Sequence, residues 1–217
     1  MCLLIENKIK TTAPMYAFVL KAVSGTQQNK AVYSLMEEQL LQKSRQNPDY
    51  YEDPLWSLEF RPGHTAGKGM FHCIARMDDA MDALRYGDWQ LNFKSAEYRL
   101  ALYLVEIPPS DVIYEGVHFR CSTNLNYKRG WGVKSYKLLM ELSPHSMFRT
   151  SLGTPVYKVN ADALILQTTD IKIVPISFES ISSTLGSLEA VEIMALICDS
   201  SSLYKEYFDS VFINKEN

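Results

Sequence analysis

Three glycines, a lysine, two histidines and a cysteine are concentrated in one stretch, GHTAGKGMFHC, which begins at Gly63. These residue types can cradle a phosphate, bind a metal ion or only turn the chain. A phosphate-binding loop needs four residues between its first glycine and the Gly-Lys pair, followed by Ser or Thr. Here Gly63 and Gly67 enclose three residues, and Lys68 is followed by Gly69. The spacing therefore excludes a nucleoside-triphosphate loop of that kind.

The second chemistry is metal binding, because His72, Cys73, His118 and Cys121 are of the types that hold zinc. Adjacent residues of a strand point to opposite faces, so one member of each pair can converge with one of the other, but not all four. Buried thiols and hydrogen-bonded imidazoles are the simpler interpretation, because free cysteine is among the most buried residue types. We therefore expect no metal.

Cys2 offers a third chemistry, because it becomes the first residue if Met1 is removed. A free α-amino group can then act as the base for the thiol, as in N-terminal-nucleophile amidohydrolases. The glycine-rich substrate motifs of those enzymes are not found later in the sequence. An amidohydrolase that uses Cys2 is kept as an alternative hypothesis.

Apolar periodicity predicts the elements that must position these side chains. Strands are expected at residues 16–23, 70–74, 98–107, 112–114, 117–121, 136–142, 155–160, 163–167 and 171–178, the last two forming a hairpin across 168–170. Residues 136–142 fit a helical turn equally well. Helices are expected at residues 30–44, 77–85, from 187 onward and at 203–213. Residues 124–132 are expected to form a polar loop.

These elements predict an α+β fold: a central, mostly antiparallel sheet with a few flanking helices and a helical C-terminal cap over residues 187–213. Residues 1–217 are expected to form a single domain. Residues 1–14 would be an N-terminal extension or an edge strand.

Composition limits the class of partner. A net charge of −3 and a pI near 5.8 provide no field that would gather nucleic acid. No segment approaches the roughly 18 consecutive apolar residues of a membrane span, and the N-terminus lacks the basic start of a secretory signal. We expect a cytoplasmic protein with reduced cysteines, in the host cytoplasm if it is viral, and no membrane partner.

The stretch that begins at Gly67 also carries a family resemblance. GKGMFH, then MDDAMDALRYG, then RLALYLVEIPPSDVIY resembles the glycine-rich turn, acidic helix and apolar strand of ADP-ribosyltransferase-like proteins. The similarity covers residues 67–114. The preceding RPGH step, residues 61–64, is also similar to small phage-encoded proteins. The resemblance implies a domain that binds NAD or a related nucleotide.

The resemblance implies a set of site residues. The cofactor-binding positions would be His64, Gly67, Lys68, Gly69, Phe71 and His72. In that family the glycines let the backbone approach the dinucleotide, and an aromatic ring packs on the nicotinamide. His64 and Lys68 would contact phosphate or ribose, and Phe71 would pack on the base. Glu106 and Glu115 are the candidate catalytic carboxylates.

The chain departs from that family at three places. The early strand offers Lys21 where the family has His or Arg, and Phe71 stands where tyrosine is frequent. Gln167 and Asp170 occupy the late-strand segment that carries the family's catalytic glutamate, which binds the ribose and stabilises an oxocarbenium-like transition state. The resemblance therefore implies an NAD-dependent transferase whose catalysis is either retained or degenerate.

A non-enzymatic role is the principal alternative. A phage or bacterial interaction protein could bind a host protein through two segments. One is the aromatic loop from Tyr50 to Phe60, which contains Trp56, and the other is the loop from Lys128 to Trp131.

Overall fold

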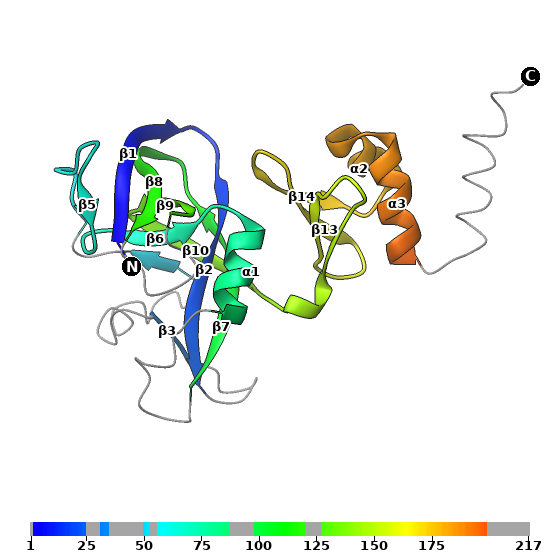
Figure 1. Cartoon of the computed structure of the whole chain (residues 1–217), viewed down its shortest axis with the longest axis horizontal. Helices are drawn as coiled ribbons and strands as arrows, with labels where there is room; N and C mark the ends of the chain where they lie inside the picture. The colour runs from blue at the N-terminus through cyan, green and yellow to red at the C-terminus, as the bar shows by residue number, and fades with distance from the viewer. Residues whose placement is uncertain are drawn as a thin grey trace, which may run out of the picture. The chain divides into compact units, whose positions relative to one another are not determined.

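The computed structural model describes residues 2–24, 31–34, 50–52, 56–86, 98–119 and 127–198. The chain divides into two compact units, Met1–Ser143 and Pro144–Asn217, and each is described by itself (Figure 1). The expectation of a single domain over residues 1–217 stays a prediction.

The first unit is built on one antiparallel sheet. Its strands are β1 (Cys2–Thr11), β2 (Met15–Ser24), β3 (Ala31–Ser34), β4 (Tyr50–Glu52), β5 (Thr65–Ala66), β6 (Phe71–Ile74), β7 (Tyr98–Ile107), β8 (Ser110–Phe119), β9 (Arg129–Val133) and β10 (Ser135–Leu142). The order is β4-β10-β7-β2-β6-β9-β8-β1-β5, and β3 pairs with β2. Residues 1–14 thus include a long strand, β1, which pairs with β8 and with the short edge strand β5.

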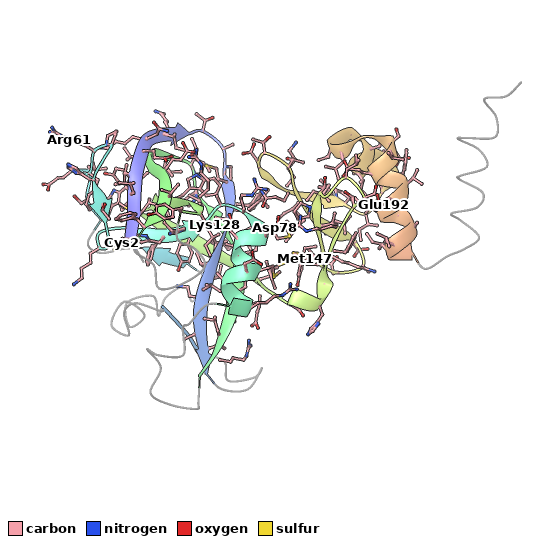
Figure 2. All side chains as sticks on the ribbon, viewed as in Figure 1. Cys2, Arg61, Asp78, Lys128, Met147 and Glu192 are labelled. Carbon is pink, nitrogen blue, oxygen red and sulfur yellow. The ribbon has the colours of Figure 1, made fainter. Side chains whose placement is uncertain are left out.

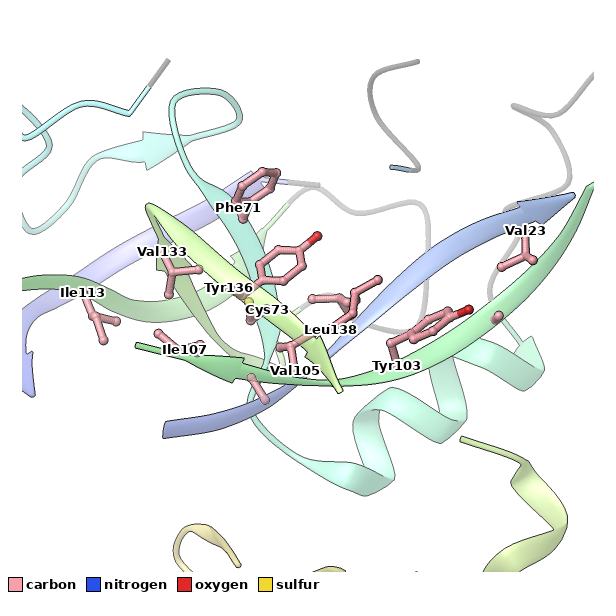
Figure 3. Packing of buried hydrophobic residues seen from close by; sticks show 13 residues of the cluster. Val23, Phe71, Cys73, Tyr103, Val105, Ile107, Ile113, Val133, Tyr136 and Leu138 are labelled. Atoms are coloured by element: carbon pink, nitrogen blue, oxygen red, sulfur yellow. The ribbon is translucent and has the colours of Figure 1, made fainter. Parts of the chain in front are cut away.

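This sheet curls back on itself where β9 passes into β10. The two strands are separated by Lys134 alone, yet β7, β2 and β6 stand between them in the strand order. The two outer strands of the segment β10-β7-β2-β6-β9 must therefore approach each other. Apolar residues of these strands meet in one cluster (Figure 3): Ala17, Val19, Val23, Phe71, Cys73, Ala101, Tyr103, Val105, Ile107, Ile113, Val133, Tyr136 and Leu138. We call the sheet side that carries these residues the inner face and the opposite side the outer face.

One helix, α1 (Met77–Tyr86), packs on the outer face against β2, β6 and β7 (Figure 1). Met77, Ala80 and Met81 are buried and recur at helical spacing. Asp78 and Asp79 lie in the first turn, where carboxylates favour the positive end of the helix dipole. The helix confirms the prediction for residues 77–85.

The second unit combines a four-stranded antiparallel sheet with two helices. Its elements are η3 (Pro144–Ser146), β11 (Met147–Arg149), β12 (Pro155–Lys158), β13 (Ala163–Gln167), β14 (Ile171–Pro175), α2 (Phe178–Leu185) and α3 (Ser187–Cys198). Ser177 caps α2 by accepting a hydrogen bond from the Ser180 amide at 3.2 Å. Gly186, with φ 97°, separates the two helices. In the interior of this unit the Thr150 hydroxyl donates to Glu189 at 2.6 Å.

The predicted fold class is confirmed: the described sheets are antiparallel, helices flank them, and α3 begins at residue 187 as expected. Strands at Tyr98–Ile107 and Ala163–Gln167 have the predicted bounds, and residues 135–142 form a strand rather than a helical turn. The hairpin of β13 and β14 is also confirmed. None of the described helices has the length and apolar character needed to cross a membrane.

Three local predictions are wrong. Ala31–Ser34 was expected to begin a helix but forms β3, because it pairs with Lys21 to Ser24 of β2. Arg129–Val133 was expected to be part of a loop but forms β9, between β6 and β8. Residues 176–178 leave the strand and lead into α2, which was not predicted. The predicted helical residues 35–44 and 203–213 lie outside the described part of the chain.

Candidate functional site

Lys21 lies on the inner face of the first unit, among apolar residues. Strand alternation places it on the side of β2 that carries Val19 and Val23, and its side chain is 3% exposed. Its ammonium nitrogen lies 5.1 Å from the ring centre of Tyr136 and 5.9 Å from that of Phe71. Both distances are within the range of a cation–π interaction. The two rings themselves pack edge to face, 4.9 Å apart (Figure 3).

Burial sets the charge of this cluster. Removal from water lowers the pKa of Lys21 to about 7, and the neighbouring Cys73 opposes part of this shift. Burial raises the pKa of Cys73 to about 12, so this thiol stays protonated at neutral pH. Near pH 7 the amine of Lys21 is thus divided between its charged and neutral forms. An anion bound beside it would favour the charged form.

A carboxylate shares the inner face with Lys21. A β-bulge between Leu138 and Met140 shifts the register of β10, and Glu141 consequently pairs with Tyr103. The Tyr103 hydroxyl donates to Glu141 at 3.2 Å, and Arg99 contacts both carboxylate oxygens, at 2.5 and 3.0 Å. The pairing raises the pKa of Arg99 further above its ordinary value, chiefly through the hydrogen bond to Glu141. Glu141 is therefore held by an ion pair and by hydrogen bonds.

The inner face therefore combines three chemical groups: an amine with a lowered pKa, two aromatic rings in contact with it, and a carboxylate on β10. Lys21 and Glu141 lie on strands β2 and β10, which are both neighbours of β7, so the two strands are about 10 Å apart across the sheet. Lys21 pairs with Ala101 and Glu141 with Tyr103, so the two residues are also offset by two positions along β7. A cation beside aromatic rings suits a ligand that joins a phosphate to a flat base.

The outer face carries a second cluster, formed by His72 of β6 and His118 of β8. Their ring centres are 6.3 Å apart and their planes are inclined by 31°. Between them lies β9, where Gly130 and Gly132 pair with both neighbouring strands. A Cβ atom at Gly130 would lie 2.4 Å from His118 Nε2 and 2.7 Å from the Cys73 carbonyl oxygen. Only glycine leaves room for the imidazole there.

Both imidazoles are neutral. Burial, followed by the presence of His118, lowers the pKa of His72 to about 3. Burial lowers the pKa of His118 to about 4, although the nearby Cys73 carbonyl opposes part of that shift. None of the four ring nitrogens makes a hydrogen bond of ordinary geometry with the described part of the chain. Among the same residues, no group of three or more His, Cys, Asp or Glu is arranged to hold a metal ion.

The structure separates the predicted cofactor-binding residues. His64 is exposed beside β5, where its Nδ1 accepts a hydrogen bond from the Arg61 amide at 3.3 Å. Lys68 is exposed in the turn before β6. Gly67 is half-buried, and Gly69 is buried with φ 80°, a backbone angle that favours glycine. Neither His64 nor Lys68 lies in the inner-face cluster, and their ligand roles stay predictions.

The remaining predicted residues point to different surfaces. Phe71 belongs to the inner face, and its neighbour His72 belongs to the outer face. Glu106 is half-buried on the side of β7 opposite to Val105 and Ile107, which face inward. Glu115 of β8 accepts a hydrogen bond from Asn7 at 3.3 Å and lies 3.9 Å from Arg129. Glu106 and Glu115 are thus not brought together.

The segments assigned to the alternative functions have structural contacts. Trp56 and Phe60 pack on Tyr114, with ring centres 5.4 and 5.6 Å apart, and Trp131 packs against the inner cluster. Lys128 forms a salt bridge of 3.0 Å with Asp79 in the first turn of α1, close to Asp78 (Figure 2). These contacts stabilise the fold and leave the binding of a host protein as a prediction.

Cys2, the candidate nucleophile, is half-buried and its thiol is free. Its backbone pairs with Phe119 in the ladder between β1 and β8. The other candidate metal ligand, Cys121, lies outside the described part of the chain. Amidohydrolase activity stays a prediction.

Sequence reasoning missed several groups of the inner face, namely Arg99, Tyr103, Tyr136 and Glu141, and it mentioned Lys21 only as a departure from the family. Alternation alone places Glu141 on the same side as Lys137, away from Tyr136, and the bulge reverses this. The signal that was present is a lysine inside an otherwise apolar strand, YAFVLKAV. A buried lysine is rare enough to mark a candidate site.

Comparisons with known proteins do not extend these observations: no protein-family model, curated protein or solved structure matches the chain.

Proposed function

We propose that the first unit binds NAD or a related nucleotide on its inner face, as an ADP-ribosyltransferase-like domain whose catalysis is degenerate. The observation that carries this proposal is the contact between Lys21 and Phe71. Under the resemblance, Lys21 occupies the early-strand position of the first motif, and Phe71 occupies the aromatic position of the nucleotide pocket. Two positions that are far apart in the sequence therefore meet on one face.

The chemistry of these residues fits a nucleotide. Protonated Lys21 would bind the pyrophosphate, and the rings of Phe71 and Tyr136 would pack on the base. Because Lys21 is 3% and Phe71 8% exposed, binding requires local side-chain movement over the inner face. Bound phosphate would raise the pKa of Lys21, so binding near pH 7 takes up protons.

The carboxylate of this face explains why we propose degenerate catalysis. Cleavage of the nicotinamide bond needs a carboxylate that binds the ribose and stabilises positive charge on it. The described inner face carries Glu141, which is already paired with Arg99 and Tyr103. Strand alternation from Ile113 places Glu115 on the same side, where it is held by Asn7 and lies 3.9 Å from Arg129. A carboxylate held by a guanidinium offers less negative charge to a substrate. We therefore expect binding to be measurable and transfer to be slow.

The experiment is calorimetric titration of the full chain with NAD and with ADP-ribose, supported by thermal unfolding. A ligand that binds only the folded state stabilises it by mass action, about 1.4 kcal/mol at ten times the dissociation constant. We expect saturable binding of both ligands below millimolar concentration. Phe71→Leu, which keeps an apolar side chain but removes the ring, should weaken binding at least tenfold.

The matched control is Lys68→Met, compared with Lys21→Met. Lys68 is exposed and lies outside the inner cluster, so if the ligand lies on the inner face the removal of Lys68 should leave the affinity within about twofold, and a larger loss would support its predicted contact with phosphate or ribose instead. Lys21→Met should abolish proton uptake and weaken binding at least tenfold. Absence of saturable binding at millimolar NAD and ADP-ribose would overturn the proposal, as would equal losses in the two lysine variants.

A further inference from the structure

The outer face of the first unit presents two imidazoles that the proposed nucleotide site does not use. His118 is fully buried, and both nitrogens of His72 are shielded from solvent. The two rings approach from β6 and β8 across the backbone of β9, where Gly130 and Gly132 carry no side chains. The missing side chains of β9 leave room for the His118 ring over Gly130 and for the Met70 thioether over Gly132.

Hydrogen bonding accounts for little of this pair, because the Cys73 carbonyl faces His118 but at a geometry poorer than that of an ordinary hydrogen bond. A neutral imidazole has one N–H donor and one nitrogen lone pair, and both are costly to bury without partners. No described residue forms an ordinary hydrogen bond with any of the four ring nitrogens. Two inert core histidines would forfeit this free energy for no evident gain. The pair is better explained by a ligand that accepts nitrogen lone pairs, which is a metal cation.

The separation of the rings suits a single ion between them. A metal about 2 Å from one nitrogen of each ring would place the ring centres roughly 5 to 6 Å apart. The observed 6.3 Å needs little adjustment.

We propose that His72 and His118 bind one soft monovalent cation of the copper(I) type, with the thioether of Met70 as a neighbouring third donor. Met70 is 3% exposed, and its Sδ lies 2.1 Å from the position that a Cβ atom of Gly132 would take. It therefore covers the glycine that pairs with His72. Imidazole and thioether donors together favour copper(I) over magnesium or calcium.

The charge and number of the donors exclude the commoner alternative, zinc. All three donors are neutral, and no third His, Cys, Asp or Glu joins them in the described part of the chain. Structural zinc sites have four ligands, usually including thiolates. Burying a divalent ion among neutral donors is more costly than burying a monovalent one. Two nitrogens, with or without a sulfur, meet the low coordination number that a copper(I)-type ion accepts.

The test uses silver(I), a diamagnetic ion of the same charge and softness, added to the full chain labelled with ¹⁵N at histidine. We expect one equivalent to shift one ring nitrogen each of His72 and His118. The exposed His64 and His145 serve as internal controls and should not move. Silver bound only to cysteine thiols would leave all four imidazoles unchanged and would overturn the proposal, as would shifts confined to His64 or His145.

Variants give a second readout by competition for copper(I) against a chromophoric chelator under reducing conditions. His118→Gln should weaken binding at least a hundredfold, whereas His64→Gln should match the wild type. Met70→Leu should weaken binding about tenfold, and an unchanged affinity would remove Met70 from the site. Zinc(II) should bind at least a hundredfold more weakly than copper(I), and equal affinities would contradict the donor assignment.

Discussion

The two faces of strand β6 carry buried polar groups of opposite chemistry. On the inner face, the cation of Lys21 lies against the rings of Phe71 and Tyr136. On the outer face, the ring nitrogens of His72 and His118 make no hydrogen bond of ordinary geometry with the described chain. The inner face thus contains a cation next to aromatic rings. In the described chain, the outer face contains imidazole lone pairs without such a cation.

This difference indicates which ligand each face can take. An amine with a pKa of about 7 gains its full charge when an anion approaches, so the inner face suits a phosphate-containing ligand. Neutral imidazoles gain from a cation, so the outer face suits a metal ion. The predictions below test the contrast, beginning with the largest expected effect.

Replacing the Phe71 ring on the inner face should lower the free energy of unfolding far more than replacing the His72 ring on the outer face. Phe71→Ala leaves a cavity beside Tyr136 and should lower the free energy of unfolding by about 3 to 5 kcal/mol. His72→Leu removes unpartnered nitrogens at similar volume, and in metal-free protein it should stay within about 1 kcal/mol of wild type. Urea denaturation measures both. Equal losses would show that His72 makes contacts as valuable as those of Phe71.

Two glycines of the outer face, Gly116 and Gly132, should differ in how much stability is lost when a methyl group is added. In Gly116→Ala the new Cβ would lie 2.0 Å from the Leu4 carbonyl oxygen, which the β1–β8 ladder holds in place. We expect a loss of about 3 kcal/mol. In Gly132→Ala it would meet the flexible thioether of Met70, and about 1 kcal/mol should be lost. Thermal unfolding in metal-free buffer ranks the two, and the reverse order would contradict this packing.

Lys21 should make stability depend on pH in a defined direction. Its pKa is about 7 when folded and near the ordinary 10.5 when unfolded. Between these values the unfolded chain binds more protons, so the free energy of unfolding rises as pH increases from about 7 to 10.5. The scale is ~1.4 kcal/mol for each unit of pKa difference. Lys21→Met should remove this rise and be the more stable protein below pH 7.

The control for that experiment is Lys68→Met, because Lys68 is exposed. Among the described residues, Cys73 of β6 and Tyr136 of β10 lie beside Lys21, and Tyr103 of β7 and Glu141 of β10 lie on the same face. They are present in both variants, so the difference between the two pH profiles isolates Lys21. A Lys21→Met profile parallel to that of Lys68→Met would contradict the burial of a charged amine.

We expect the smallest effect at the ion pair of Arg99 and Glu141, which lies where the inner face meets solvent. Arg99 and Glu141 have side chains that are 53% and 27% exposed, so their ion pair is screened by water. Arg99→Gln should change the free energy of unfolding by less than about 1 kcal/mol, measured by urea denaturation. The same variant should raise any slow hydrolysis of NAD, because it frees the carboxylate. A loss above 2 kcal/mol would show that this pair is a structural anchor.

The sequence predicts local elements of this fold well where one pattern dominates. YRLALYLVEI forms β7 as expected, because it is apolar on both alternating faces and Pro108 ends it. Residues 31–34 form a strand because β2 offers an edge, which is a tertiary effect that local helical periodicity cannot anticipate. The same holds for RGWGV, whose glycines suggest a loop until two neighbouring strands pair with it.

The sequence predicts the candidate sites only in part. Alternation correctly separates His72 from Cys73, and it allows one member of each His/Cys pair to converge, as His72 and His118 do. It cannot show which residues of distant strands meet, so the contact of Lys21 with Phe71 was not foreseen. A bulge that reverses the faces of β10 has no clear local signature in YKLLMEL.

The most direct test of nucleotide binding on the inner face is an NMR titration of the Lys21 side chain, followed through its Cε resonance, with and without saturating ADP-ribose. The free protein should give a pKa of about 7, and the bound protein should give a pKa at least one unit higher. A Lys21 pKa near 10.5 in the free protein would contradict the buried amine. A pKa of about 7 that does not change with saturating ligand would contradict binding at this face.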